Sequence, residues 1–255
     1  MNNGHGHSAT IWTASTHQAR ALSPVAASLC EEELAQARRL KQKGDRDRFV
    51  AARTLLRHAL SEAVDGQIGP AQWRYRIGPA GKPEMAHGLP QLDFNISHAA
   101  DCVAIGVSAS GAIGVDIETT VPDDRLEVVE NALSDRERAH LVALPENRKW
   151  ATFVQFWTIK EACAKALGLG ITLDFRELEI TLNPPRVHNS RGLLDPGKGF
   201  AIETGSIMMD RRPYCLSVAK ITEATGNTPF WFRALADNRT GQSDGIENGN
   251  VMGCI

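Results

Sequence analysis

Two acidic residues spaced two apart, Asp116 and Glu118, are the side chains whose types and spacing first suggest chemistry. They lie in the run Ala112–Glu118, where apolar residues alternate with glycine or acidic residues, a pattern typical of a half-buried strand. Side chains alternate along a strand, so Gly114, Asp116 and Glu118 share one face. The Cα atoms of the two acidic residues would lie about 7 Å apart, so both carboxylates could bind one hard cation such as Mg²⁺.

The residues before this run predict a β-hairpin. Cys102–Val107 is mostly apolar, and Ser108–Gly111 has the composition of a turn. Both lead into Ala112–Glu118, so we expect the apolar run and the acidic run to be successive paired strands.

A helix expected over 150–167 carries the next candidate pair, Glu161 and Lys165. Apolar residues recur there at helical spacing, and the glycines at 168 and 170 end the pattern. Glu161 and Lys165 lie four residues apart, an arrangement that stabilises a helix by roughly 0.2–0.5 kcal/mol. Taken alone, this spacing is sufficiently explained by an exposed ion pair between Glu161 and Lys165 that stabilises the helix.

Further elements follow from periodicity, caps and turn residues. Ser134, with Glu137 three residues later, has the form of a capping box at a helix start. Arg48 and Arg53 lie on a helix that Asp45 could cap, but five residues is about 140° around a helix, so they do not share one face. We expect helices over about 28–43, 45–64, 134–144 and 150–167, and strands over 11–15, 73–77, 171–181, 200–203 and 213–219.

Composition argues against several classes of protein. A formal net charge of −2 argues against general nucleic-acid binding, although the region 38–57 is locally basic. The five cysteines are scattered and form no C-x-x-C pair, which indicates neither a disulfide framework nor a zinc site and fits a reducing cytoplasm. Because no apolar run is long enough to span a membrane and residues 1–10 lack the core of a signal peptide, we expect a cytoplasmic protein without membrane contact.

Three motifs, in this order, resemble the signatures of the 4′-phosphopantetheinyl transferases: Phe94–His98, Gly114–Glu118 and Trp157–Lys165. The sequence is similar to the two-lobed, surfactin-synthetase-activating type over about residues 46–220, and Gly81–Pro83 falls where that family has the same tripeptide. The resemblance implies an α+β fold, a pseudo-dimer of two similar lobes, each a small antiparallel sheet with packed helices, with the active site between the lobes. It implies a monomer that uses Mg²⁺ and transfers phosphopantetheine from coenzyme A to a serine of an apo acyl or peptidyl carrier protein.

The resemblance also assigns roles to residues. Asp116, Glu118 and Glu161 would be the metal ligands. Glu161 would also take the serine proton, with a water-mediated acidic residue as the alternative, and Lys165 would offset charge on the departing nucleotide. The coenzyme A contacts would be Arg48, Arg53, Lys82, Pro83, Ser97, His98, Lys160 and Lys165.

The expected domains are an N-terminal lobe over 1–118, which binds coenzyme A and carries the first metal ligands, and a C-terminal lobe over 119–222. A mobile C-terminal extension is expected over 223–255. A faint internal echo fits two similar lobes, because Phe49–Val50 recurs as Phe153–Val154 in a similar context.

Two other functions stay open at this point. A Mg²⁺-dependent hydrolase would cleave a pyrophosphate or phosphodiester with water and would need no carrier protein. A non-catalytic partner would bind acidic carrier proteins through the basic region 38–57, although the three carboxylates speak against it. Within the resemblance, Glu33 and Gln36 stand where some members have lysines, which alters part of the expected phosphate contact.

Overall fold

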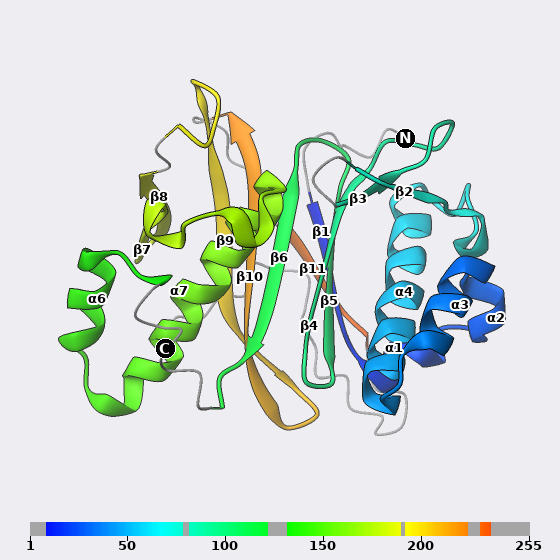
Figure 1. Cartoon of the computed structure of the whole chain (residues 1–255), viewed down its shortest axis with the longest axis horizontal. Helices are drawn as coiled ribbons and strands as arrows, with labels where there is room; N and C mark the ends of the chain where they lie inside the picture. The colour runs from blue at the N-terminus through cyan, green and yellow to red at the C-terminus, as the bar shows by residue number, and fades with distance from the viewer. Residues whose placement is uncertain (1–8, 79–81, 122–131, 190–191, 224–229, 236–255) are drawn as a thin grey trace. The chain divides into compact units, whose positions relative to one another are not determined.

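The computed structural model describes residues 9–78, 82–121, 132–189, 192–223 and 230–235 (Figure 1). They form a mixed α+β fold with several small sheets. The chain divides into two compact units. The first unit contains the described residues up to Ser110 together with the last strand, and the second contains those from Gly111 to Glu223.

The first unit is built on a four-stranded sheet of order β11-β1-β5-β4. β1 is antiparallel to β5, β5 is antiparallel to β4, and β11 runs parallel to β1. β2 and β3 form a separate two-stranded sheet. The elements are β1 (Ala9–Ser15), α1 (Thr16–Ala21), α2 (Val25–Ser28), α3 (Glu31–Arg39), α4 (Lys43–Ala63), the 3₁₀ turn η1 (Pro70–Gln72), β2 (Tyr75–Ile77), β3 (Pro83–Met85), β4 (Asp93–Ala99), β5 (Cys102–Ser108) and β11 (Phe230–Ala234).

The long helix α4 packs on this sheet through an apolar stripe. Leu55, Leu56 and Leu60 are fully buried and belong to one core cluster with Val103 and Ile105 of β5. Burying each such side chain contributes roughly 1.5–3 kcal/mol, so the helix and the sheet stabilise each other through this core.

The second unit also places a long helix on a small sheet, of order β6-β10-β9 and antiparallel throughout. β7 and β8 pair separately. The elements are β6 (Ile113–Thr119), α6 (Asp135–Val142), α7 (Glu146–Leu167), the 3₁₀ turns η2 (Gly170–Thr172) and η3 (Phe175–Glu177), β7 (Glu179–Leu182), β8 (Pro185–Asn189), β9 (Lys198–Met209) and β10 (Arg212–Glu223).

The helix α7 shares one apolar core with this sheet. Phe156, Ile159 and Cys163 on the helix cluster with Cys215 and Ala219 on β10. At its C-terminal end, Gly168 adopts the left-handed conformation with φ 72°, which a glycine tolerates without strain and which ends the helix. The expected helix over 150–167 is confirmed, with a start four residues earlier at Glu146.

The capping box predicted at residue 134 is confirmed. The Ser134 hydroxyl accepts a hydrogen bond from the Glu137 amide, and the Glu137 carboxylate accepts one from the Ser134 amide, so α6 begins where expected. The strand expected over 171–181 is wrong in its first part, where η2 and η3 precede β7. Short 3₁₀ turns carry no strong periodic signal that distinguishes them from an apolar strand.

The predicted hairpin between residues 102–107 and 112–118 is wrong in its pairing. β5 pairs with β1 and β4, whereas β6 pairs with β10. The turn composition of Ser108–Gly111 correctly indicated a strand end, but a turn does not determine which strand is the next partner. The partner of β6 lies almost a hundred residues further along the chain, beyond the reach of any local pattern.

The division between the units differs from the expected boundary after residue 118. β6, with Asp116 and Glu118, belongs to the second unit because its ladder is formed with β10. β11 lies within the range 223–255, where a mobile extension was expected, and it pairs with β1. Residues 236–255 lie outside the described residues. No helix in the described part of the chain combines the length and the apolar character needed to cross a membrane.

Candidate functional site

The strand β6 presents its two acidic residues to the helix α7. A Cβ atom placed on Gly114 would lie only 1.9 Å from the carbonyl oxygen of Ala162, so the Gly114 face of the strand is the face that meets α7. Asp116 and Glu118 share this face, because side chains alternate along a strand. The predicted strand is therefore confirmed, and the contacts of Gly114 and Asp116 with α7 place these two residues on one face, although residues 113–117 are buried on both faces rather than one.

The helix α7 supplies a cation to this face. The Lys165 ammonium donates a hydrogen bond to Asp116 Oδ1 at 2.6 Å and another to the Val115 carbonyl oxygen at 3.2 Å. Asp116 is buried and the Lys165 side chain is 24% exposed, so this ion pair is shielded from water on one side. It joins the strand to the helix, unlike the exposed pair within one helix that the spacing of Glu161 and Lys165 alone had suggested.

Glu161 lies one helical turn before Lys165, and its pKa is affected by the charges of Asp116, Glu118 and Lys165. Burial raises the pKa of Glu161, and the negative charges of Asp116 and Glu118 raise it further, while the Lys165 ammonium acts in the opposite direction. Lys165 thus contacts Asp116, and the charges of Asp116, Glu118 and Lys165 act on Glu161; the role of these four residues as one site stays a prediction.

The donor set fits a divalent cation that prefers oxygen ligands. Carboxylates are the side-chain ligands that Mg²⁺ takes in proteins, and the remaining positions are filled by water and phosphate. Within the described residues, no group of three or more His, Cys, Asp or Glu side chains already has the geometry of a metal site. In this arrangement the Lys165 ammonium, bonded to Asp116, supplies the positive charge.

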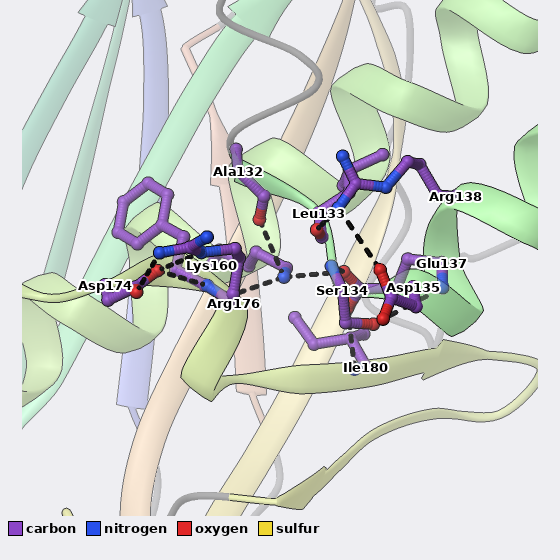
Figure 2. Close-up of polar contacts among 11 residues, drawn as sticks. Ala132, Leu133, Ser134, Asp135, Glu137, Arg138, Lys160, Asp174, Arg176 and Ile180 are labelled. Atoms are coloured by element: carbon purple, nitrogen blue, oxygen red, sulfur yellow. Dashed lines mark hydrogen bonds and ion pairs between the residues drawn. The ribbon is translucent and has the colours of Figure 1, made fainter.

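Lys160 does not belong to this site, which corrects its assignment as a coenzyme A contact. Its side chain is fully buried, and its ammonium is 2.6 Å from Glu137 Oε2. It also donates to the carbonyl oxygen of Ala132 at 2.9 Å (Figure 2) and to that of Phe175 at 2.8 Å. An ammonium has three donors, so all of them are used inside the second unit.

The arginines expected to bind coenzyme A lie on α4 in the first unit. Arg48 forms an ion pair with Asp45, three residues before it. Arg53 lies 3.8 Å from Glu33 Oε1, and its guanidinium is 5.4 Å from the centre of the Phe49 ring. Both arginines therefore have local partners, and the structure leaves their role toward a ligand as a prediction.

The remaining expected contacts lie near β4. The Lys82 ammonium donates to Asp93 Oδ1 at 2.8 Å, and Pro83 begins β3. Ser97 is buried and His98 is exposed. Neighbouring residues on a strand point to opposite faces, so these two side chains diverge.

Sequence reasoning missed a buried ion pair in the first unit. The Glu33 carboxylate accepts hydrogen bonds from Arg57 Nε at 2.8 Å and from the Cys30 amide at 3.2 Å. Glu33 is thus buried within the first unit. Its helical position is visible in the sequence, but its partner lies 24 residues away on another helix, and no local pattern indicates such a contact.

Comparison with known proteins supports one family. The sequence profile of the 4′-phosphopantetheinyl transferase superfamily matches residues 112–219, which include β6 and α7. The 4′-phosphopantetheinyl transferase HetI of Nostoc sp. is 35% identical over 168 residues, which cover 64% of this chain and 69% of HetI. The 4′-phosphopantetheinyl transferase ffp of Bacillus subtilis is 32% identical over 152 residues, which cover 60% of this chain and 66% of ffp. The chain therefore belongs to the 4′-phosphopantetheinyl transferase family.

The matches do not extend over whole proteins. They span 58% to 69% of the lengths of the curated relatives. The crystal structure of a holo-(acyl-carrier-protein) synthase from Bacillus anthracis in complex with CoA (3′,5′-ADP) covers 44% of this chain and 96% of its own, with 18% identity and a TM-score of 0.36. That likeness is too low to support an argument about fold or substrate.

Proposed function

We propose that this protein transfers the 4′-phosphopantetheine group from coenzyme A to a serine of an apo acyl or peptidyl carrier protein. The products would be the holo-carrier protein and adenosine 3′,5′-bisphosphate. The observation that carries the proposal is the convergence of Asp116, Glu118 and Glu161 with Lys165 in a chain of this family.

The reaction would be a displacement at the β-phosphate of coenzyme A. The serine hydroxyl oxygen forms a bond to this phosphorus, and the bond to the oxygen that bridges the two phosphates breaks, so that oxygen leaves with the adenosine bisphosphate. Glu161 would accept the serine proton as the new bond forms. A water-mediated acidic residue is the alternative base.

Positive charges bound near Glu161 would balance the negative charge of the pyrophosphate. Asp116, Glu118 and Glu161 would hold Mg²⁺ through their carboxylate oxygens. When bound, Mg²⁺ supplies positive charge against the phosphate oxygens. The Lys165 ammonium would offset the charge that develops on the departing oxygen.

The contacts to the rest of coenzyme A are proposed on the first unit. They are Arg48, Arg53, Lys82, Pro83, Ser97 and His98, while Lys160 is no longer among them. We propose that the two units correspond to the two lobes of the family and that the protein acts as a cytoplasmic monomer.

Mass spectrometry of a panel of apo carrier proteins tests this function. Incubation with the purified protein, Mg²⁺ and coenzyme A should raise the mass of at least one carrier by one phosphopantetheine group. The variants Asp116→Asn and Glu161→Gln should remain folded by circular dichroism and give no mass increase. Release of free phosphopantetheine in the absence of a carrier would instead identify a hydrolase, and no mass increase on any carrier would contradict the proposal.

A further inference from the structure

The buried ion pair of Lys160 and Glu137 connects four segments of the second unit. The Glu137 carboxylate accepts hydrogen bonds from the Ser134 amide at 2.7 Å and from the Ile180 amide at 2.8 Å (Figure 2). It also receives the Lys160 ammonium at 2.6 Å. The ammonium in turn donates to the carbonyl oxygens of Ala132, three residues before α6, and of Phe175 in η3. One pair thus ties α7 to α6, η3 and β7.

Stability alone does not explain such a pair. Taking two charges out of water costs about as much as their attraction returns, and replacing a buried ion pair by well-packed neutral side chains is often neutral or stabilising. Directional hydrogen bonds also fix the position of the side chain that makes them. Three acceptors from three segments fix the point that the Lys160 ammonium occupies, and through it the rotation of α7 about its axis.

This rotation bears on the carboxylate site, because Lys160 is followed directly by Glu161. Successive residues of an α-helix are about 100° apart, so the two side chains leave the helix in different directions. Lys160 enters its buried contacts, while Lys165, one helical turn after Glu161, reaches Asp116 on β6. On the strand side, Gly114 lets the backbone of α7 approach β6 but does not by itself prevent the helix from turning.

We propose that the Lys160–Glu137 pair is a positioning pair for the metal site: it sets the rotation of α7 and so holds Glu161 in range of Asp116 and Glu118. This inference rests on the proposed function insofar as that function assigns a metal to these carboxylates. Residues that orient metal ligands from outside the ligand set typically change metal affinity about 10–100-fold when they are replaced.

The first unit contains a matched control. There Arg57 is fully buried, pairs with Glu33 at 2.8 Å, and donates to the carbonyl oxygens of Pro70 and Trp73. Glu33 also accepts from the amide of Cys30, just before its own helix, as Glu137 does from Ser134. The two pairs have the same chemistry and comparable burial, but only one of them holds the helix that carries Glu161.

The experiment compares the double variants Glu137→Gln/Lys160→Met and Glu33→Gln/Arg57→Met in the full chain. Each replaces a buried charge pair by neutral side chains of similar length, and the glutamine oxygen can still accept a hydrogen bond from a backbone amide. Circular dichroism confirms folding, and Mn²⁺ binding without coenzyme A is followed by the loss of the free-ion signal in electron paramagnetic resonance, with Mg²⁺ as competitor.

We expect Glu137→Gln/Lys160→Met to bind Mn²⁺ about 10–100-fold more weakly than the wild type, and Glu33→Gln/Arg57→Met to bind it unchanged. Equal Mn²⁺ affinity in the wild type and in folded Glu137→Gln/Lys160→Met would overturn the positioning role, and so would equal weakening in both double variants. If the first double variant does not fold, Glu137→Gln alone replaces it, with weaker Mn²⁺ binding expected and unchanged binding again contradictory.

Failure of the proposed function gives a different result. In that case the wild-type protein itself would modify no carrier, whatever its Mn²⁺ affinity. A wild type that modifies a carrier and binds Mn²⁺, beside a folded variant with the same affinity, would overturn the positioning role alone.

Discussion

Gly114 on β6 and Ala162 on α7 lie so close that a Cβ atom on Gly114 would come within 1.9 Å of the Ala162 carbonyl oxygen and 2.5 Å of the Ala166 amide nitrogen. Both contacts are to helix backbone, which cannot move aside as the end of a flexible side chain can. The missing side chain is thus what allows the helix to approach the strand, and the short arm of Asp116 reaches Lys165 because of it.

The variant Gly114→Ala should therefore separate β6 from α7. We expect a loss of about 1–3 kcal/mol in the free energy of unfolding, the usual cost of overpacking a core, together with a loss of carrier modification. Urea unfolding followed by circular dichroism measures the first quantity. Gly44→Ala is the control, since a Cβ there meets only the Arg48 side chain at 3.6 Å and should leave stability unchanged or raise it. Equal stability of Gly114→Ala and the wild type would contradict the close contact.

Lys165→Met should lower the stability of the protein without metal, and added Mg²⁺ should restore part of that stability. Removing the ammonium leaves Asp116 among other carboxylates, and we expect a loss of roughly 1.5–3 kcal/mol, the range for a hydrogen bond to a charged group. Because Mg²⁺ would replace the lost positive charge, its addition should raise the melting temperature of the variant more than that of the wild type.

The control for this prediction is Lys149→Met on the same helix, where the partner Glu146 is 89% exposed. An exposed pair contributes at most about 1 kcal/mol, so stability and metal response should stay near those of the wild type. Scanning calorimetry in EDTA and in Mg²⁺ compares the three proteins. A metal-induced rise that is equal in Lys165→Met and the wild type would count against the shared site.

The raised pKa of Glu161 predicts a stability that falls as pH rises in the absence of metal. A raised pKa means that the folded protein holds this proton more tightly than the unfolded chain does. The resulting stabilisation is fully present below the ordinary pKa of a glutamate and is lost as the pH rises through the raised value. Glu161→Gln should therefore be more stable than the wild type at pH 8 in EDTA and similar to it near pH 4.

Urea unfolding at the two pH values measures this difference, and added Mg²⁺ should reverse it at pH 8, since only the wild type keeps all three carboxylates. A variant less stable than the wild type at pH 8 in EDTA would show that Glu161 is not destabilised by its neighbours.

His98→Ala should weaken coenzyme A binding, because the resemblance to the family assigns His98 to the 3′-phosphate. A hydrogen bond to a charged group is worth roughly 1.5–3 kcal/mol, which corresponds to about a tenfold to hundredfold higher Kd. Isothermal titration calorimetry with coenzyme A and with its 3′-dephospho form separates this contact from others, because only the first ligand should be affected. His87→Ala, also an exposed histidine of the first unit, is the control. Equal weakening of the binding of both ligands would show that His98 does not contact the 3′-phosphate.

Local patterns predicted the elements of the site better than their partners. The alternation around Asp116 and the helical spacing of Glu161 and Lys165 both depend on backbone periodicity, which a sequence displays directly. The pairing of β6 with β10, by contrast, depends on contacts between segments far apart in the chain. The same limit explains why β11 was missed, since a strand of five residues at the sheet edge has little periodic signal.

Lys160 shows where a motif misleads. It stands beside Glu161 in the motif Trp157–Lys165, and a lysine there is easily assigned to a phosphate. Only the tertiary contacts reveal that it points to Glu137, whose capping role was predicted but whose second role as a buried counter-ion was not. A lysine is rarely found fully buried, so exposure was the natural expectation.

The parallel pairing of β11 with β1 has a consequence for biosynthesis. The second unit's described elements form one continuous stretch of chain, whereas the sheet of the first unit begins at Ala9 and receives its last strand only at Phe230–Ala234. As the chain leaves the ribosome, β1 is synthesised first, but its partner β11 is synthesised only after the described elements of the second unit. Until then β1 offers an open edge to other chains, and among the described elements the sheet of the first unit is completed last although it begins first.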